Sequence, residues 1–301
     1  FGVNDWTFVQ TFIDDIGVNP NAFFHPQYAA LTAFGTIARS DYHGGSLSVR
    51  QRLGEWLSYD LNYTYSKSTD GVSGLQTGGG FGSAFILNPI RPEDSIAVSD
   101  FDATHVVNAN FLVQLPFGKG QMFDDLGTTA DFFIGGWQLG GVFRFNTGRP
   151  WDAHFDDDGW DTNWNIKSRG VRTGPIQTSP TRGATPNLFS DLNLLSNSLR
   201  GPRPGETGDR NVFRDTGYST LDMSASKIFR LPWNETHSLQ FRWEVFNVLN
   251  QQYLAAANAV QISDTNSSAA NPAVTLSPDS GLFTATRGTP RRMQFGVRFS
   301  F

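Results

Sequence analysis

Apolar and polar residues alternate strictly along the last nine residues of the chain. The apolar positions are Met293, Phe295, Val297, Phe299 and Phe301, and small or polar residues separate them. Successive side chains of a β-strand point to opposite faces, so one face of this strand is apolar and the other tolerates water. Three phenylalanines within seven residues are typical of an outer-membrane β-barrel, whose outer face contacts lipid and whose inner face lines a wet lumen.

The same alternation predicts six further strands. They cover Ser46–Leu53, Trp56–Lys67, Ala103–Leu115, Gly136–Thr147, Tyr218–Leu231 and Ser238–Leu249. The second of them alternates most cleanly, and its outward positions are Leu57, Tyr59, Leu61, Tyr63 and Tyr65. Tight turns at Gly54 and Glu55 and at residues 232–235 join neighbouring strands. We therefore expect seven antiparallel strands, each with one apolar and one polar face.

The connections between these strands alternate between short and long. Residues 68–102, 148–216 and 250–290 form the long connections, and 148–216 has almost no strand pattern. Outer-membrane barrels have short periplasmic turns and long external loops. We therefore expect these three segments outside the cell, together with most of residues 1–44. The 116–134 connection falls on the periplasmic side but is too long for a simple turn, so we expect a short strand or helix near Asp131–Ile134.

The composition agrees with strands that face lipid and loops that face water. The 301 residues include 26 Phe, 8 Trp and 7 Tyr, yet the mean hydropathy is −0.32. No apolar run approaches the roughly 18–20 residues of a transmembrane helix, whereas a barrel strand needs only about 9–11 alternating residues. A soluble β-sandwich would also alternate, but connections of roughly 40–70 residues are rare in compact domains. We therefore expect an all-β, antiparallel transmembrane β-barrel with long extracellular loops.

Charge, cysteine content and histidine spacing argue against other classes of function. A formal net charge of −5 gives no polybasic surface for nucleic acid, and the absence of Cys excludes a disulfide framework and thiolate metal sites. The five histidines lack the spacing of a zinc site. His105 lies near Asp102, which could suggest a hydrolase, but no Ser occupies a Gly-x-Ser-x-Gly elbow. We therefore expect a barrel histidine and no enzyme.

Charged residues fall on the inward face of the predicted strands. They are Arg50, Arg52, Arg144, Arg242 and Arg298, with Asp60, Asp222 and Glu244. In one interpretation they steer an anionic or polar ligand through the lumen, which makes Arg144, Arg242 and Arg298 candidate ligand contacts. In the other they pair with one another and with whatever fills the lumen. We favour pairing, because charges on a buried side need partners whether or not a ligand binds.

The longest connection contains a cluster of carboxylates and tryptophans. The candidate ligand-binding residues in it are Asp156, Asp157, Asp158, Trp160 and Trp164. Carboxylates so close together could bind Ca²⁺ within residues 152–161 through oxygen ligands, and an exposed Trp could stack on a sugar or an aromatic ligand. The spacing lacks the full EF-hand pattern. A solvated acidic loop is therefore favoured, and we expect no other cofactor.

Six segments, taken in their order along the chain, resemble a known family. They are YTYSKSTD (63–70), DATHVVNANFLVQLPFGKG (102–120), GGWQLGGVFRFNTGRPW (135–151), GDRNVFRDTGYSTLDMSASKIF (208–229), LQFRWEVFNVLNQQY (239–253) and TPRRMQFGVRFSF (289–301). Together they are similar to the C-terminal end of TonB-dependent outer-membrane receptors. Among these receptors, the Oar-like proteins with an N-terminal carboxypeptidase-regulatory-like domain resemble the chain most.

This resemblance implies a barrel of about 22 strands with a plugged lumen, in the outer membrane of a diderm bacterium. It also implies uptake of a scarce nutrient, powered through TonB from the inner membrane. Seven strands are roughly a third of such a barrel, and we find no TonB box, plug domain or N-terminal extension. Because the chain begins at Phe1 rather than Met, we expect the C-terminal part of a larger barrel, or one piece of a split barrel.

The expected partners follow from the same resemblance. They are outer-membrane lipid, the remaining barrel strands, the plug and, through the missing N-terminal part, TonB. Resemblance to outer-membrane proteins further implies that Phe301, with Phe299 and Phe295, belongs to a signal read by the barrel-assembly machinery. The alternative to import is a structural or adhesive surface protein that displays large loops.

Overall fold

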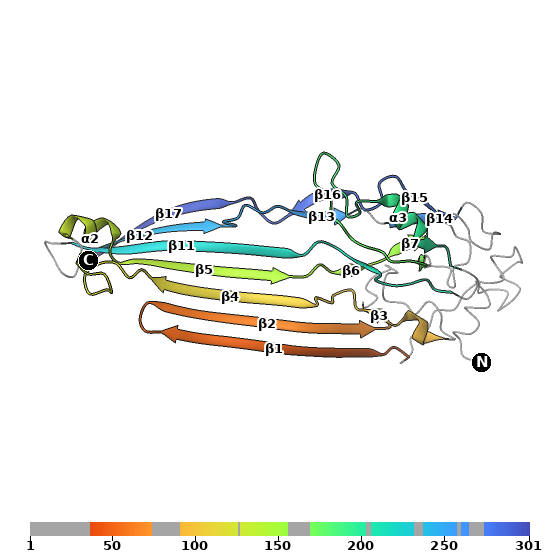
Figure 1. Ribbon diagram of the computed structural model, residues 1–301, viewed down its shortest axis with the longest axis horizontal. Helices are drawn as coiled ribbons and strands as arrows, with labels where there is room; N and C mark the ends of the chain where they lie inside the picture. The colour runs from red at the N-terminus through yellow and green to blue at the C-terminus, as the bar shows by residue number, and fades with distance from the viewer. Residues whose placement is uncertain are drawn as a thin grey trace, which may run out of the picture.

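The main feature of the fold is a sheet of seven long strands, in which each strand pairs antiparallel with the next long strand along the chain. The computed structural model describes residues 37–73, 91–125, 127–155, 169–202, 206–231, 237–257, 260–264 and 274–301. The strands are β1 (Ser40–Leu53), β2 (Leu57–Asp70), β4 (His105–Gln114), β5 (Trp137–Asn146), β11 (Tyr218–Arg230), β12 (Ser238–Phe246) and β17 (Arg292–Ser300). The protein is therefore all-β, and the seven predicted strands are confirmed (Figure 1).

The register of the sheet confirms the predicted faces. Leu47 lies opposite Tyr63, and Arg50 lies opposite Asp60, so apolar and polar rows cross the first two strands in step. A slip of one residue would turn every apolar side chain toward the lumen. Several outward side chains are more than half exposed, namely Leu47, Tyr65, Phe295, Val297 and Phe299. A continuous exposed apolar surface of this kind marks a contact with a membrane or with another protein.

Some strand ends differ from those predicted. β1 begins at Ser40 rather than Ser46, and β12 ends at Phe246 rather than Leu249. Asn247 and Asn250 have φ angles of 52° and 49°. This left-handed conformation suits Asn better than most residues and cannot continue a strand. The alternation of apolar and polar residues in the sequence extends beyond the end of β12 into a turn, so the predicted strand was too long.

The described parts of the connections lie at the two ends of the sheet, while the turn predicted at 232–235 and residues 1–36 of the predicted loop lie outside the described residues. The β1–β2 turn, the β4–β5 connection and the C-terminus lie at one end, here called the periplasmic end, and the long connections lie at the other, external end (Figure 1). The β4–β5 connection contains helix α2 (Thr128–Ile134), which confirms the short element expected near Asp131–Ile134. No helix in the described part of the chain is long and apolar enough to cross a membrane.

The described parts of the long connections contain regular structure that the sequence pattern did not predict. A turn of 3-10 helix, η2 (Pro92–Ser95), precedes β3 (Ala97–Val98), which pairs with the end of β2. The connections at 148–216 and 250–290 contain β6 (Pro150–Trp151), β7 (Ala153–Phe155), β8 (Val171–Arg172), α3 (Leu192–Asn197), β9 (Leu199–Arg200), β10 (Phe213–Arg214), β13 (Tyr253–Ala257), β14 (Val260–Asp264), β15 (Val274–Leu276) and β16 (Phe283–Arg287). Although residues 148–216 show almost no strand pattern, the described part of this connection contains five strands of two or three residues and helix α3.

These elements pack around a hydrophobic core of their own, and we call the unit the external cap. Its buried residues are Ala153, Leu188, Phe189, Leu195, Leu199, Phe213, Val260, Ile262, Val274 and Phe283. The strand pairs join distant parts of the chain, because β14 lies parallel to β7 with Val260 opposite Ala153. Strands this short carry too few residues to show an alternation, which is why the sequence pattern missed them.

Candidate functional site

Polar side chains on the inward face of β1 and β2 bind one another in a ladder. Arg50 Nη2 lies 2.7 Å from Asp60 Oδ2. Asn62 Nδ2 donates to Asp60 Oδ1 at 2.6 Å, and Ser48 Oγ donates to Asn62 Oδ1 at 2.7 Å. This part of the lumen face therefore follows the favoured interpretation, in which inward charges pair with one another.

The three candidate arginines of the lumen face differ in their surroundings. Arg242 forms an ion pair with Glu244, which also accepts a hydrogen bond from Gln294. Arg144 lies in the row between β4 and β11, Arg298 lies beside Gln240 of β12, and both side chains are exposed on the inward face. Pairing therefore accounts for Arg242. Contact with a ligand stays a prediction for all three.

A recess of about 180 Å³ opens on the lumen face near the external ends of β11, β12 and β17. Asp222 lies on its wall and accepts a hydrogen bond from the backbone N–H of Asn247 at 2.8 Å. Tyr218 and Tyr253 line it with ring centroids 4.8 Å apart, and Arg292 adds a cation. The recess thus combines aromatic faces with groups of both charges at the mouth of the lumen.

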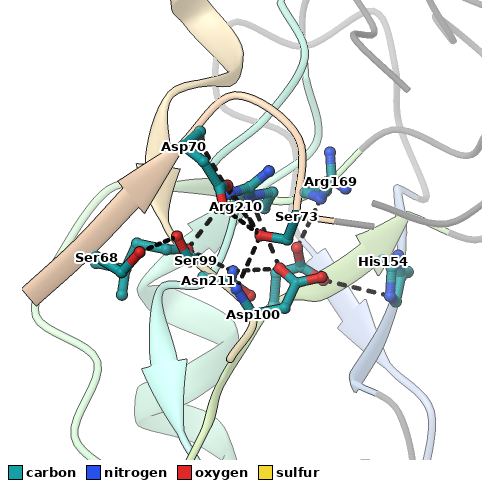
Figure 2. Close-up of polar contacts among 11 residues, drawn as sticks. Ser68, Asp70, Ser73, Ser99, Asp100, His154, Arg169, Arg210 and Asn211 are labelled. Carbon is teal, nitrogen blue, oxygen red and sulfur yellow. Dashed lines mark hydrogen bonds and ion pairs between the residues drawn. The ribbon is translucent and has the colours of Figure 1, made fainter. Parts of the chain in front are cut away.

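A buried ion pair fastens the external cap to the end of β2. Arg210 forms a salt bridge with the Asp70 carboxylate, and its Nη2 also donates to the Asp70 carbonyl at 3.0 Å. Asn211 Nδ2 donates to the Val98 carbonyl at 2.6 Å and to Asp100 Oδ1 at 2.7 Å. Figure 2 shows these side chains converging from the end of β2, the segment that follows β3 and the segment at 210–211.

A second ion pair in the same region joins the β5–β11 connection to the β2–β4 connection. Arg214 Nη2 lies 2.5 Å from Asp102 Oδ2, and Arg214 Nη1 donates to the Gly148 carbonyl at 3.0 Å. The Asp102 side chain is 1% exposed and also accepts from the backbone N–H of Ser68 at 2.7 Å. Removing one member of a buried pair is strongly destabilising, because it leaves the other charge without compensation. The two arginines therefore attach the cap to the external end of the sheet.

The acidic cluster of the longest connection lies only partly within the described residues. Asp152 is buried and takes its partners from the cap, with Arg169 Nε at 2.6 Å and His154 Nε2 at 3.3 Å. The five candidates in this connection lie outside the described residues and are Asp156, Asp157, Asp158, Trp160 and Trp164. The possible Ca²⁺ site in 152–161 therefore stays a prediction.

Comparison with known families identifies the architecture. Residues 9–294 match the family model of the outer membrane beta barrel domain. The chain belongs to this family. It is therefore an outer-membrane protein of a diderm bacterium, and the exposed apolar face of its sheet is the face that contacts lipid. No curated protein and no solved structure matches the chain.

Several predicted residues of this outer membrane beta barrel domain lie on the lipid-facing side. His105 Nδ1 lies 2.9 Å from the Tyr63 hydroxyl, and its ring lies between Tyr63 and Tyr65. Asp102 pairs with Arg214 instead, so the Asp–His pair that would favour a hydrolase is not formed. Phe295 stacks on Trp243 with centroids 6.0 Å apart, while Phe299 and Phe301 stack on each other and are exposed. Their role as an assembly signal stays a prediction.

The sequence pattern missed the residues that carry the densest polar contacts. Asp70 lies just beyond the predicted strand Trp56–Lys67, and Arg210 and Arg214 lie in a segment without strand period; the two ion pairs join residues 112 and 140 positions apart in the sequence. These three residues lie in two of the segments that resemble the family, YTYSKSTD (63–70) and GDRNVFRD (208–215), but the sequence predicted no role for any of them. Lys227 was also missed, although the period of two along β11 places it among the outward residues.

Proposed function

We propose that this outer-membrane protein forms the C-terminal part of a TonB-dependent receptor of the Oar-like type, which takes up a scarce nutrient. The observation that carries the proposal is a polar inner face on a sheet that is open at both edges. Among the described residues, β1 and β17 each pair on one side only. Open strand edges do not occur in lipid, so further strands, from this chain or another, complete the barrel.

The lumen face suits a wide barrel better than a narrow one. Small barrels fill their interior with packed side chains, whereas barrels of about 22 strands enclose a plugged lumen. The inward face of this sheet carries ion pairs such as Arg50–Asp60 and the exposed side chains of Arg144 and Arg298. We infer that the exposed cations face a plug or a passing solute, which would be anionic or polar.

We infer that the external cap makes the uptake of nutrients selective. It is fastened to the barrel wall through Arg210 and Arg214, and a polar recess lies at the mouth beside Asp222. A nutrient captured outside would meet the cap first and the lumen arginines afterwards. The tryptophans and carboxylates of 156–164 remain candidates for the first contact, because binding residues concentrate on loops held by a rigid scaffold.

Nutrient uptake can be tested in the organism that carries the gene. We would delete the gene and compare growth on a panel of limiting nutrients, namely chelated iron, cobalamin, oligosaccharides and peptides, with and without functional TonB. The proposal expects one growth defect that appears on deletion, is restored by the complete gene and also appears when TonB is lost. Unchanged growth on every nutrient would contradict import.

A display function is the second candidate, and one observation favours it. The external cap has its own buried core and is not a set of open loops, so it could present a fixed surface to another cell or to a matrix. In the same deletion strain this candidate expects normal growth together with altered adhesion. A growth defect that depends on TonB would argue against display as the main role.

A further inference from the structure

A lysine lies in the apolar, lipid-facing rows of the sheet close to the periplasmic end. Lys227 sits between Trp137 of β5 and Phe241 of β12, both of which face outward. A Lys on the lipid face costs about 2–4 kcal/mol at the midplane of the bilayer and about 0–1 kcal/mol near the interface. Yet Lys227 is only 5% exposed, so part of the protein covers it on the outer side of the sheet.

Helix α2 is the element that covers Lys227. The Lys227 ammonium donates to the Phe132 carbonyl at 2.6 Å and to the Asp131 carbonyl at 3.1 Å. These carbonyls belong to the last turn of α2, at the negative end of its dipole. The Asp131 carbonyl also accepts from the backbone N–H of Gly135 at 2.9 Å, so the ammonium is a second donor to that oxygen.

A ring contact and a hydrogen bond confirm that α2 lies on the outward face. The rings of Phe132 and Phe229 have centroids 5.1 Å apart, and Phe229 follows Lys227 in the outward row of β11. The indole N–H of Trp137 donates to the Phe133 carbonyl at 2.8 Å. The helix is therefore attached to the lipid-facing side of the sheet, not to its lumen side.

The rest of the β4–β5 connection packs closely against this helix, and glycines make the close approach possible. Asp131 Oδ1 accepts from the backbone N–H of Lys119 at 2.9 Å. A Cβ on Gly135 would lie 2.3 Å from the same oxygen, and a Cβ on Gly118, whose φ is +112°, would lie 2.7 Å from the Cα of Gly135. Only glycines allow the segment at 117–123 to approach α2 so closely.

The result is an exposed apolar surface beside the lipid-facing rows. We call it the periplasmic patch, and its members are Phe117, Met122, Phe123, Phe132, Phe133 and Ile134. Phe133 is 66% exposed and Met122 is 83% exposed. The patch is continuous with the lipid-facing sheet through Phe229 and Trp137, and it lies at the same end as the C-terminus (Figure 1).

We propose that the periplasmic patch inserts into the phospholipids of the inner leaflet of the outer membrane. Short amphipathic segments lie in this way at the boundary between headgroups and acyl chains, about 5–10 Å deep. Lys227 and Trp137 hold α2 in place for this contact, and the Lys227 ammonium donates to helix carbonyls rather than facing the lipid. The β4–β5 connection is thus a membrane-surface anchor, whether the complete protein imports a nutrient or displays its cap.

The anchor can be tested by measuring the depth of single labels. The described sequence contains no native Cys, so Phe133→Cys and Met122→Cys can each carry an environment-sensitive fluorophore. The complete protein would be reconstituted into vesicles of phosphatidylethanolamine and phosphatidylglycerol that contain spin-labelled phospholipids. Val297→Cys provides a lipid-facing control and Gln138→Cys a lumen-facing control, since these two side chains are exposed on opposite faces of the sheet.

We expect the labels at 133 and 122 to be quenched by phospholipids that carry the spin label near the headgroup, to within about twofold of the label at 297. Iodide in the water should quench them at least threefold less than the label at 138. Labels that iodide reaches as readily as position 138 would overturn the proposal. Labels shielded from both quenchers would overturn it too, because they would indicate a protein partner. Met122, whose side chain is the more exposed, keeps the test valid if Phe133→Cys fails to assemble.

Discussion

Arg210 and Asp70 form a buried ion pair although 140 residues separate them along the chain. Each side chain is 4% exposed. Asp70 is the last residue of β2, whereas Arg210 belongs to the connection between β5 and β11. The pair therefore joins the external cap directly to the wall of the barrel. Its loss should destabilise the cap more than the strands.

Replacing Arg210 by Met should loosen the external cap. The change leaves the Asp70 carboxylate buried without its partner, and breaking a buried pair in this way costs about 3–5 kcal/mol. Hydrogen exchange of the complete protein in membranes would report the effect. Amides at 206–216 should exchange faster in the variant, while amides of β11 and β12 should not change.

The matched control for this change is Arg200→Met. Arg200 forms a 2.6 Å ion pair with Glu206 in the same region, but the two side chains are 15% and 36% exposed. Pairs that water reaches contribute little to stability, so this variant should exchange nearly as the parent does. Equal acceleration in both variants would show that burial of the Arg210 pair has no special effect.

Gly208 should resist substitution for a steric reason. A Cβ at this position would lie 1.9 Å from the Arg169 carbonyl oxygen, and φ at Gly208 is +73°. Gly208→Ala should therefore separate the segment at 207–209 from Arg169 and speed protease cleavage within the cap of intact cells by at least about tenfold, if the clash costs more than about 1.4 kcal/mol.

Gly183→Ala distinguishes the clash from the backbone strain. Gly183 also has a positive φ, of +151°, but nothing lies within 4 Å of its Cβ position. Both variants suffer a left-handed backbone penalty, and only Gly208→Ala suffers the collision. Similar cleavage rates for the two variants would assign the whole effect to backbone strain.

The two faces of β4 should respond in opposite ways to the same new side chain. Ala109 lies in an outward row near the middle of β4, whereas Asn110 faces inward beside Asp60. Ala109→Arg should lower the free energy of unfolding by up to about 2–4 kcal/mol, because it places a cation against lipid. Asn110→Arg should be nearly neutral, since it points into the lumen next to a carboxylate. Denaturant unfolding of the complete barrel in vesicles would measure both, and a larger loss at Asn110 would reverse the assignment of the faces.

The sequence alone predicted the barrel strands but not the cap, and the reason is physical. Lipid on one side and water on the other impose a period of two on every spanning strand, so rows such as Leu47–Tyr63 can be read without a structure. The cap is built from strands of two to five residues and from ion pairs such as Arg210–Asp70. These short strands and ion pairs depend on contacts between segments far apart in the sequence, and a local sequence pattern does not predict such contacts.

The structure of the periplasmic end could be predicted in part, less well than the strands and better than the cap. A short element near Asp131–Ile134 was predicted from the length of the connection, and α2 confirms it. Its position on the outward face could not be predicted, because it depends on the contacts of Lys227 and Trp137 with carbonyls of the helix. A lysine in an outward row was the one available signal, since such a residue needs a partner in order to remain beside lipid.

Phe301→Ala should reduce the amount of protein assembled in the outer membrane, if the terminal aromatic residues act as a signal for the barrel-assembly machinery. Phe301 is 91% exposed and stacks only on Phe299 in the described structure, with centroids 6.0 Å apart. Its removal should therefore cost the folded barrel little, and a loss of assembled protein would point to recognition during assembly. Val297→Ala is the control, because Val297 is 67% exposed on the same lipid-facing row of β17. The folded fraction can be read from heat-modifiable gel migration of membranes isolated soon after induction. A several-fold decrease for Phe301→Ala with little change for Val297→Ala would support the signal, whereas equal folded fractions in both variants would reduce Phe301 to one more lipid-facing side chain.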